Sequence, residues 1–524
     1  MSSRTVTGRT AFHGALLTSA WTLGSRVLGF VRDALMVASF GMSAELGAFN
    51  VAWIVPNLFR KLFGEGAVGA AIQPALARAR QEGGPERAGR LYMRFHGLLA
   101  LALAVAVAAG EAVIWIWRAR LGDGAPATAL ALRYASILLP YALPICLTAL
   151  AAAPQNLSGR FLFPALAPLL LNVVWIGCLL AVAGFPGADG GHAGAAEGAL
   201  LCFGVLAGGV LQWLLQVPGL RASGYPLLPR FLPGDGEVRR TLRSFLPALA
   251  GLAAVQINMA LDQGLVWILV GPEANTYAYL ANRLLQLPLA LIGISAATGA
   301  LPLFARLAAE GRRPELAAAL QRAAESALIL IVAAAAGLYA VAEPTIRVLF
   351  EHGRFEQGDS ALLAGTLRAY LWCLPAATVG GLLTRVRQAS GDYAGPAKVA
   401  FASVPVNLVL DLLLLPRLGV PGAGYATAAA LTVQALLLAG GLGRLGLGPP
   451  LRLGRLPRLL APGAAAGAAA AATVAALGGA ADHLPGLAAG IAAGVTAATA
   501  ATVWLLPEEF RELLAGLRRR AAAG

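Results

Sequence analysis

The sequence carries little charge for its length. Only 13% of the 524 residues are Asp, Glu, Lys or Arg, about half the usual share in soluble domains. By contrast, 58% of the residues are hydrophobic and the mean hydropathy is +0.71. Apolar runs that reach membrane-spanning length with their flanks recur along the chain, as at 97–109, 328–341 and 461–477. The composition therefore predicts an all-α polytopic membrane protein, because the alternating pattern of a membrane β-barrel is missing.

Residues that build metal, redox and catalytic sites are scarce. The five histidines show no H-x-x-x-H or H-E-x-x-H spacing, which argues against a zinc enzyme. The sequence has no G-x-x-x-x-G-K-[ST] phosphate loop, no D-x-D motif and no pair of catalytic carboxylates. We therefore expect no ATP, no resident cofactor and no enzymatic activity. No C-x-x-C spacing occurs either, and we interpret four cysteines as buried packing residues: Cys146, Cys178, Cys202 and Cys373.

The net charge of +14 comes mainly from arginines in short loops, where it indicates membrane topology rather than nucleic-acid binding. If the N-terminus is cytoplasmic, most arginines lie in inside loops, and the outside loops hold only Arg118, Arg120, Arg347, Arg354 and Arg417. We therefore predict that both termini are cytoplasmic and that no signal peptide is removed. About fourteen helices are expected to span the membrane, at approximately 12–40, 46–77, 92–117, 130–154, 162–184, 196–218, 243–270, 275–304, 323–349, 361–388, 396–416, 419–443, 459–479 and 484–506.

Two segments of the first half of the sequence recur in the second half. RYASILLPYA matches RAYLWCLPAA, and SGRFLFPA matches SGDYAGPA at nearly the same separation along the chain. An apolar helix with an asparagine, Asn172 or Asn407, follows the second segment of each copy. Both copies have the same predicted orientation, which indicates two six-helix lobes related by a parallel internal repeat. We assign the N-terminal lobe to 1–222, the C-terminal lobe to 223–450, and two additional helices with a cytoplasmic tail to 451–524.

Several ionisable residues fall inside the predicted spans. Each costs at least ~2.5–3.5 kcal/mol at membrane depth, so it needs a partner or a polar cavity. In the first span, Arg26 and Asp33 are seven residues apart and share a helix face, whereas Arg32 points about 120° away from Arg26. One interpretation places Arg32 and Asp33 near the membrane interface and pairs Arg26 with an acid. The other makes these residues the wall of a cationic cavity.

Two further spans favour the cavity. The stretch VPNLFRKLFGEGAVGA places Arg60, Lys61 and Glu65 after Pro56, which we expect to bend the helix. Arg283 lies near the start of the eighth span, in the second lobe. Arginines from both lobes would then line one cavity. Because a guanidinium stays charged in a low dielectric and binds phosphate bidentately, such a cavity suits an anionic head group, especially a diphosphate.

These residues lie in segments that resemble a known family. SRVLGFVRDALMVASFG and AFNVAWIVPNLFRKLFGEGAVGAAIQPALAR resemble the start of the MurJ (MviN) lipid II flippases, of the multidrug/oligosaccharidyl-lipid/polysaccharide exporter superfamily. NRLLQLPLALIGISAATGALPLFAR, VLFEHGRFEQGDS and SGDYAGPAKVAF resemble later segments. The resemblance implies movement of undecaprenyl-diphosphate-linked peptidoglycan precursor across the bacterial inner membrane, by alternating access, for cell-wall synthesis. It implies substrate binding by Arg26, Arg32, Asp33, Arg60, Glu65, Asn172 and Arg283, which Ser25 adjoins.

A second polar group is predicted in the C-terminal lobe. Asn407 and Asp411 are four residues apart on one helix face, Asp262 lies in the seventh span, and Thr427 lies in the twelfth. Their oxygens suit a small hard cation, and the resemblance to family members with a sodium site supports sodium coupling. Two alternatives stay open. In the first, the four residues only hydrogen-bond between helices. In the second, protonation of Asp262 or Asp411 couples transport to protons.

The sequence leaves other functions open. The family commonly has aspartates where this chain has Gly47 and Asn282, which indicates altered cargo or coupling. One alternative is a flippase or exporter for another polyprenyl-linked glycan or an amphipathic drug. Another is a non-transporting scaffold of the cell-wall machinery, which would tolerate loss of the buried arginines. We expect lipid II or a related polyprenyl-diphosphate glycan, membrane lipids and cell-wall synthesis proteins as partners, and no nucleic acid.

Overall fold

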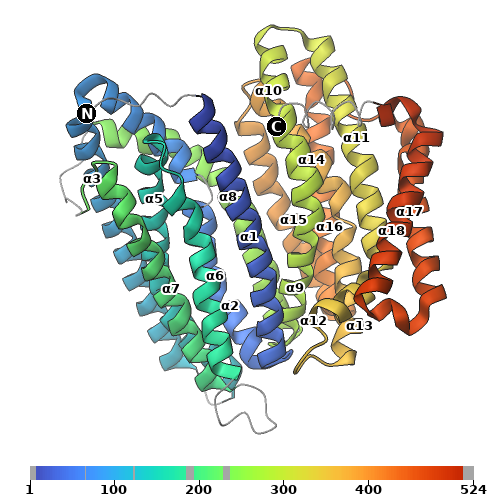
Figure 1. Cartoon of the computed structure of the whole chain (residues 1–524), viewed down its shortest axis with the longest axis horizontal. Coiled ribbons are helices and arrows are strands. Elements are labelled where there is room, and N and C mark those ends of the chain that lie inside the picture. The colour runs from blue at the N-terminus through green and yellow to red at the C-terminus, as the bar shows by residue number, and fades with distance from the viewer. Residues whose placement is uncertain (1–7, 65–66, 122–123, 184–193, 228–235, 512–524) are drawn as a thin grey trace. The chain divides into compact units, whose positions relative to one another are not determined.

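The computed structural model describes the chain except for residues 1–7, 65–66, 122–123, 184–193, 228–235 and 512–524. Within the described residues all regular elements are helices, so the predicted all-α fold class is confirmed. The helices form two compact units, 1–260 and 261–524 (Figure 1). By length and composition, 11 described stretches can cross a membrane. The expected number of about fourteen spans and the boundaries 1–222, 223–450 and 451–524 stay predictions.

The first unit begins with a charged helix and is held by aromatic packing. It comprises α1 (Gly8–Phe40), α2 (Ala44–Phe59), η1 (Arg60–Gly64), α3 (Ala67–Arg120), α4 (Pro126–Leu138), η2 (Leu139–Tyr141), α5 (Ala142–Leu157), α6 (Leu162–Ala183), α7 (Ala195–Ala222) and most of α8 (Gly236–Leu269). Trp53 of α2 lies between Tyr141 and Trp175 of α6, with ring centroids 5.1 and 5.4 Å away. These rings fix α2 against the rest of the unit.

The predicted second span, 46–77, is divided among α2, η1 and the start of α3. Pro56 lies inside α2, and the helix changes to the wider π form at Arg60. Farther along, Gly83 and Gly84 have non-helical dihedral angles inside α3, and Gly84 has a φ of 67°. A φ of this sign favours glycine, so the glycine pair makes the bend that connects the second and third predicted spans.

The second unit contains the two C-terminal helices. It comprises α9 (Ala274–Pro288), η3 (Leu289–Ile294), α10 (Ser295–Ala309), α11 (Arg313–Ala340), α12 (Ala342–Phe350), α13 (Gln357–Leu371), α14 (Leu374–Ala389), α15 (Ala394–Leu418), α16 (Val420–Gly440), η4 (Leu442–Leu445), η5 (Leu453–Arg455), α17 (Leu456–Leu477), η6 (Gly478–Asp482) and α18 (Leu484–Leu505). A Cβ added at Gly463 of α17 would lie only 2.4 Å from Cγ1 of Val332 on α11. Glycine thus permits the close contact of these two helices.

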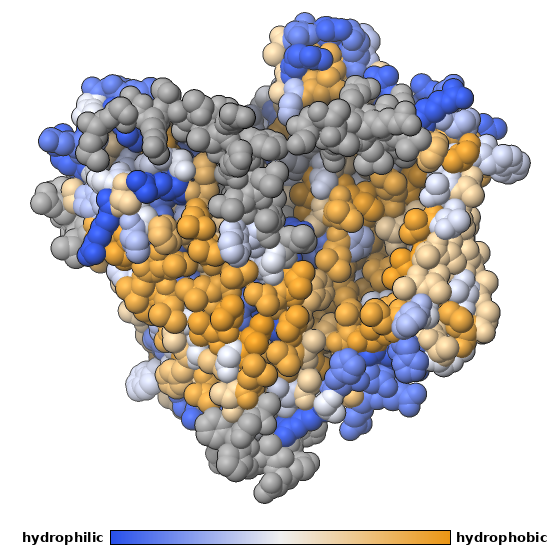
Figure 2. Space-filling view, viewed as in Figure 1, coloured by the Kyte–Doolittle hydropathy of each residue, from blue (hydrophilic) through white to orange (hydrophobic). Residues whose placement is uncertain are grey.

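Apolar side chains cover the middle of the helices. Figure 2 shows hydrophobic residues gathered there and hydrophilic residues toward the helix ends. Exposed members include Leu101 and Val105 of α3, Leu436 of α16 and Val495 of α18. Water does not favour so much exposed apolar surface, whereas the hydrocarbon core of a bilayer does. The chain is therefore a multi-pass membrane protein.

Candidate functional site

A buried polar network joins α1 to α6 in the first unit. Arg32 is 8% exposed and Asp33 is 1% exposed. The Arg32 guanidinium donates to Asp33 Oδ1 through Nε at 3.0 Å and through Nη2 at 2.6 Å. Its Nη1 donates to Oδ1 of Asn172 at 3.2 Å, and its Cζ lies 4.3 Å from the centroid of the Trp175 ring. The carboxylate, the amide and the ring face together offset the cost of burying this charge.

Asn172 extends the network along α1. Its Nδ2 donates to the Ser25 carbonyl oxygen at 2.9 Å and to Ser25 Oγ at 3.3 Å. The structure thus brings together four of the predicted site residues, Ser25, Arg32, Asp33 and Asn172. Arg32 and Asp33 are both buried in this unit, and the two interpretations of the first span stay predictions. Besides its neighbour in sequence, Arg32 contacts Asn172 and Trp175 of α6.

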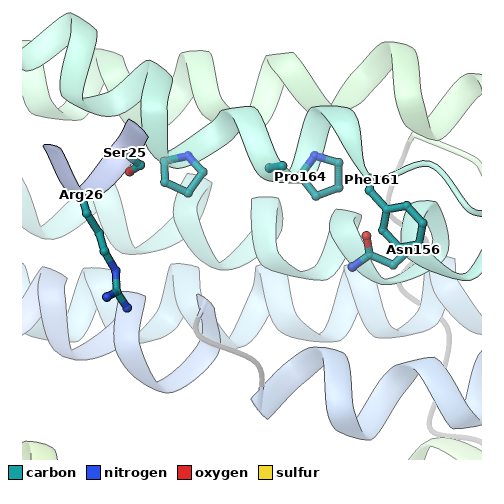
Figure 3. Close-up of a pocket in the computed structure, with 7 residues that line it drawn as sticks. Ser25, Arg26, Asn156, Phe161 and Pro164 are labelled. Carbon is teal, nitrogen blue, oxygen red and sulfur yellow. The ribbon is translucent and has the colours of Figure 1, made fainter. Parts of the chain in front are cut away.

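Arg26 lies on the exposed side of α1 and lines a pocket of about 300 Å³. We call it the α6 pocket. In Figure 3, Ser25 and Arg26 of α1 lie at one end of the pocket. Asn156 and Phe161 lie at the other end, and Pro164 of α6 lies between the two ends. The pocket is lined by Ser25, Arg26, Asn156, Phe161, Pro164, Ala165 and Pro168. The guanidinium of Arg26, one of the predicted site residues, is therefore accessible to a ligand in this pocket.

Arg60 occupies the first position of the π-helix η1. Its Nε and Nη2 donate to Asn57 Oδ1 at 3.0 and 2.9 Å, and the side chain is half-buried. The next residue, Lys61, places Nζ 3.7 Å from Sδ of Met259 on α8. Predicted site residue Glu65 lies outside the described residues. Short π segments inside α-helices are frequent at functional sites, so the location of Arg60 fits a functional role.

Arg283 lies on α9 of the second unit and is half-buried. Next to it, Asn282 Oδ1 accepts a hydrogen bond from Gln286 Nε2 at 2.8 Å. Pro288 ends α9, and the π-helix η3 follows directly. The convergence of Arg283 with the arginines of the first unit stays a prediction.

Sequence reasoning missed the π-helices and the aromatic partner of Arg32. Each π segment follows a proline inside a long apolar helix, Pro56 or Pro288. A proline inside a long apolar run is thus the sequence feature that could have pointed to a π segment, although by itself it predicts only a bend. Trp175 comes three residues after Asn172, and residues with this spacing lie on one helix face. The pair was therefore detectable once Asn172 was selected.

The four residues of the predicted cation site meet within the second unit. Asn407 Nδ2 donates to Asp262 Oδ1 and, at 3.0 Å, to Asp411 Oδ2. Thr427 Oγ1 donates to Asp262 Oδ2 at 3.2 Å. Asn407 and Asp411 are fully buried and Asp262 is 7% exposed. The cluster thus joins α8, α15 and α16 through two carboxylates, one amide and one hydroxyl.

Two oxygens in this cluster have no hydrogen-bond partner within the described part of the chain. They are Oδ1 of Asn407 and Oδ1 of Asp411, and both are buried. Buried acceptors without a partner are rare and costly. Hydrogen bonding between helices accounts for the other oxygens and leaves these two unexplained. A small cation or a proton would give them a partner, so the donor set is compatible with such a ligand.

Comparisons with known proteins identify the family. The family model described as lipid II flippase MurJ matches residues 36–480. A probable lipid II flippase MurJ from Rhizobium meliloti (strain 1021) is 34% identical over 459 residues, which cover 84% of this chain and 83% of that protein. The chain belongs to the MurJ family of lipid II flippases. MurJ proteins are transporters and not enzymes.

Two solved structures have a similar fold. A structure titled lipid II flippase MurJ, inward closed conformation, has a TM-score of 0.77 at 22% identity and covers 95% of this chain and 100% of its own. An inward-facing multidrug resistance MATE family transporter of the MOP superfamily has a TM-score of 0.66 at 18% identity, and the match covers 80% of this chain and 94% of that transporter. The MurJ family match includes Arg60, Asn172, Arg283 and the cation cluster, and it begins after the charged residues of α1.

Proposed function

We propose that this chain is a lipid II flippase, which moves undecaprenyl-diphosphate-linked peptidoglycan precursor from the inner to the outer leaflet. The observation that carries the proposal is membership of the MurJ family over residues 36–480. The site chemistry supports it, because Arg26, Arg60 and Arg283 fall inside three of the predicted membrane spans. A diphosphate is a double anion that guanidinium groups bind in a fixed geometry.

Three arginines bind the cargo in this proposal. Arg26 is exposed beside the α6 pocket, and Arg60 and Arg283 are half-buried next to π-helical segments. They bind the diphosphate while the polyprenyl chain stays in lipid. The two lobes then alternate between inward and outward access. Binding has to be moderate, because a site that holds its cargo too tightly does not release it.

Arg32, Asp33 and Asn172 act differently, as positioning residues. Their polar atoms are used within the network that fastens α1 to α6. Breaking a buried ion pair by removing one partner costs about 3–5 kcal/mol. The network therefore holds α1 in the register that presents Arg26 to the cargo.

The cluster of Asp262, Asn407, Asp411 and Thr427 couples transport to a cation. Carboxylate, amide and hydroxyl oxygens would hold a small hard cation such as sodium. When bound, the cation neutralises charge on two neighbouring buried carboxylates. Protonation of Asp262 or Asp411 is the second form of the same coupling, and it is favoured if stability responds to pH but not to sodium.

The chain acts in the bacterial inner membrane with both termini in the cytoplasm. The arginine bias of the loops supports this orientation. Its partners are lipid II and the surrounding membrane lipids, with cell-wall synthesis proteins as further candidates. A cysteine placed in the tail beyond Phe510 should react with a membrane-impermeant thiol reagent only after the inner membrane is broken, and reaction in intact spheroplasts would reverse the orientation.

Complementation tests the function. A bacterium depleted of its own lipid II flippase expresses this chain, and labelled lipid II in the outer leaflet is measured. Rescue is expected, and it should be lost with Arg26→Ala, Arg60→Ala or Arg283→Ala. The matched control is Arg322→Ala, an exposed arginine of α11, which should keep rescue. Failure by an abundant, inserted wild-type protein would favour another polyprenyl-linked glycan, and full rescue by all three variants would rule out the arginine site.

A further inference from the structure

Part of the α6 pocket is formed by the segment SGRFLFPA, which belongs to the first copy of the predicted internal repeat. The loop before α6, at Ser158, and the loop before α15, at Ser390, have the same backbone pattern. Arg160 N donates to Gln155 O at 2.9 Å, and at the corresponding place a main-chain bond of 2.9 Å connects Asp392 N to Arg387 O. In this shared part, Phe161, Pro164 and Ala165 correspond to an aromatic residue, a proline and an alanine. The apolar wall of the pocket is therefore a feature of the duplicated scaffold.

The polar residues of the pocket differ between the copies. Asn156 corresponds to Gln388, whose side chain accepts a hydrogen bond from Arg385 at 3.0 Å. Within the described residues, the side chains of Asn156 and Arg26 form no hydrogen bond or ion pair. When Asp33 is aligned with Asp262, Arg26 corresponds to Val255. The first copy thus adds an exposed cation and an unengaged amide to a common apolar frame.

The size and direction of the pocket restrict its ligand. About 300 Å³ is the lower end of the range for small-molecule sites, enough for part of a head group. From Phe161 to Pro168 the pocket follows α6 for about 10 Å at 1.5 Å per residue. The loop end, with Asn156 and Phe161, faces the cytoplasm in the predicted topology, and Arg26 lies deeper. A lipid of the inner leaflet presents its parts in this order, with sugar outermost and phosphate next to the chain.

We infer that the α6 pocket is a docking site in which a membrane-anchored phosphosugar first binds from the inner leaflet. Arg26 binds a phosphate, Asn156 bonds a sugar hydroxyl or acetamido group, and Phe161 with the prolines contacts the apolar face of the ring. The start of α6 adds the partial positive charge of a helix N-terminus. This inference rests on the proposed function and names where in the first unit its cargo binds before transport.

Photo-crosslinking and binding test the inference with the full chain in nanodiscs. A photoreactive benzoylphenylalanine replaces Phe161, and the probe is labelled short-chain lipid II. We expect crosslinking at this position and a loss of affinity of at least about tenfold, equal to 1.4 kcal/mol, in Ala165→Trp, which fills the pocket. The matched control is Ala397→Trp at the corresponding position of the second copy, which should bind normally. Asn156→Leu, similar in size, provides a second variant if Ala165→Trp does not fold.

Competition identifies the part of the ligand that is recognised. Unlabelled short-chain lipid II should prevent crosslinking, whereas inorganic diphosphate and phosphatidylglycerol should not. Equal competition by phosphatidylglycerol would overturn the inference in favour of a general anionic-lipid site, and equal competition by diphosphate would remove the sugar from it. Normal affinity in both Ala165→Trp and Asn156→Leu, in a chain that rescues the depleted host, would refute the pocket and leave the proposed function standing. Absence of rescue together with pocket-dependent crosslinking would refute the function alone.

Discussion

Removal of the Asp33 carboxylate should destabilise the first unit strongly. Asp33 is 1% exposed and accepts two hydrogen bonds from Arg32, at 3.0 and 2.6 Å. In Asp33→Ala the Arg32 guanidinium stays buried without its counter-charge, which costs about 3–5 kcal/mol. Arg32→Met should cost a similar amount, because it takes the guanidinium away from a buried carboxylate. In the double variant neither charge is left, and the remaining loss is chiefly the Arg32–Asn172 hydrogen bond, about 1–3 kcal/mol.

The free energy of unfolding can be measured by titration with dodecyl sulfate in mixed micelles, followed by circular dichroism. We expect the double variant to be more stable than either single variant. If its destabilisation equals the sum of the two single values, the residues are energetically independent and the reasoning from the ion pair is refuted.

The same variants separate positioning from contact with the cargo. If Arg32 only positions α1, the double variant should regain part of the transport along with its stability. If Arg32 binds the cargo, stability returns and transport does not. Arg322→Ala, exposed on α11, is the control for loss of an arginine as such.

Three further predictions concern the second unit. Sodium should raise the thermal stability of the wild type but not of Asp411→Asn, and equal responses would reject the cation site. Burial alone would raise the pKa of Asp392, but a backbone N–H and the Arg387 guanidinium outweigh it and hold the pKa below its usual range. The pair's stabilisation should thus be present at neutral pH and be lost below about pH 4, and Asp392→Asn should flatten that acid limb. Arg347 bonds Asp482 at 2.5 Å, so Arg347→Ala should speed hydrogen exchange in η6, whereas unchanged exchange would show that the contact does not hold that turn.

The all-α fold class followed from hydropathy. Apolar runs gave many of the helices after 120 within a few residues, as for 162–184 against α6 (Leu162–Ala183), whereas the span predicted at 323–349 began ten residues after the start of α11 (Arg313–Ala340) and extended into α12. The second span was the exception, because its internal breaks come from Pro56 and from the dihedral angles of Gly83 and Gly84 rather than from polarity. A window average does not detect such breaks. They depend on backbone geometry at single residues.

The candidate sites were predictable as a set of residues but not as an arrangement. A charge inside an apolar run signals a partner or cavity, which identified Arg26, Arg32 and Asp33. The identity of the partner depends on the rotation of α1 against α6, and helical periodicity alone does not determine that rotation. The cation cluster was easier to predict, since Asn407 and Asp411 already share a face of α15.

Each unit contains a buried polar network that includes an aspartate and an asparagine from two different helices, and one residue beside the aspartate differs between the two networks. In the first unit, Asn172 of α6 accepts a hydrogen bond from Arg32 of α1, which is paired with Asp33. In the second, Asn407 of α15 contacts Asp262 of α8. The two aspartates and the two asparagines are separated by nearly the same length of chain, which is close to the spacing of the repeat. With the aspartates aligned, Arg32 corresponds to a leucine, so the first unit has a fixed guanidinium where the second has no cation of its own.

This difference predicts the effect of Arg32→Leu, which gives the first unit the composition of the second. The Asp33 carboxylate would lose the guanidinium that is fixed beside it. A sodium or lithium ion that binds there only in the folded state stabilises it by RT ln(1 + [ion]/Kd). We therefore expect thermal stability to depend on sodium or lithium more steeply in Arg32→Leu than in the wild type, with choline inactive. When Asp33→Ala is combined with Arg32→Leu, the additional dependence of thermal stability on sodium or lithium should disappear. An equal slope in wild type and Arg32→Leu would mean that the guanidinium does not take the place of a cation, and that the two polar centres differ in more than this residue.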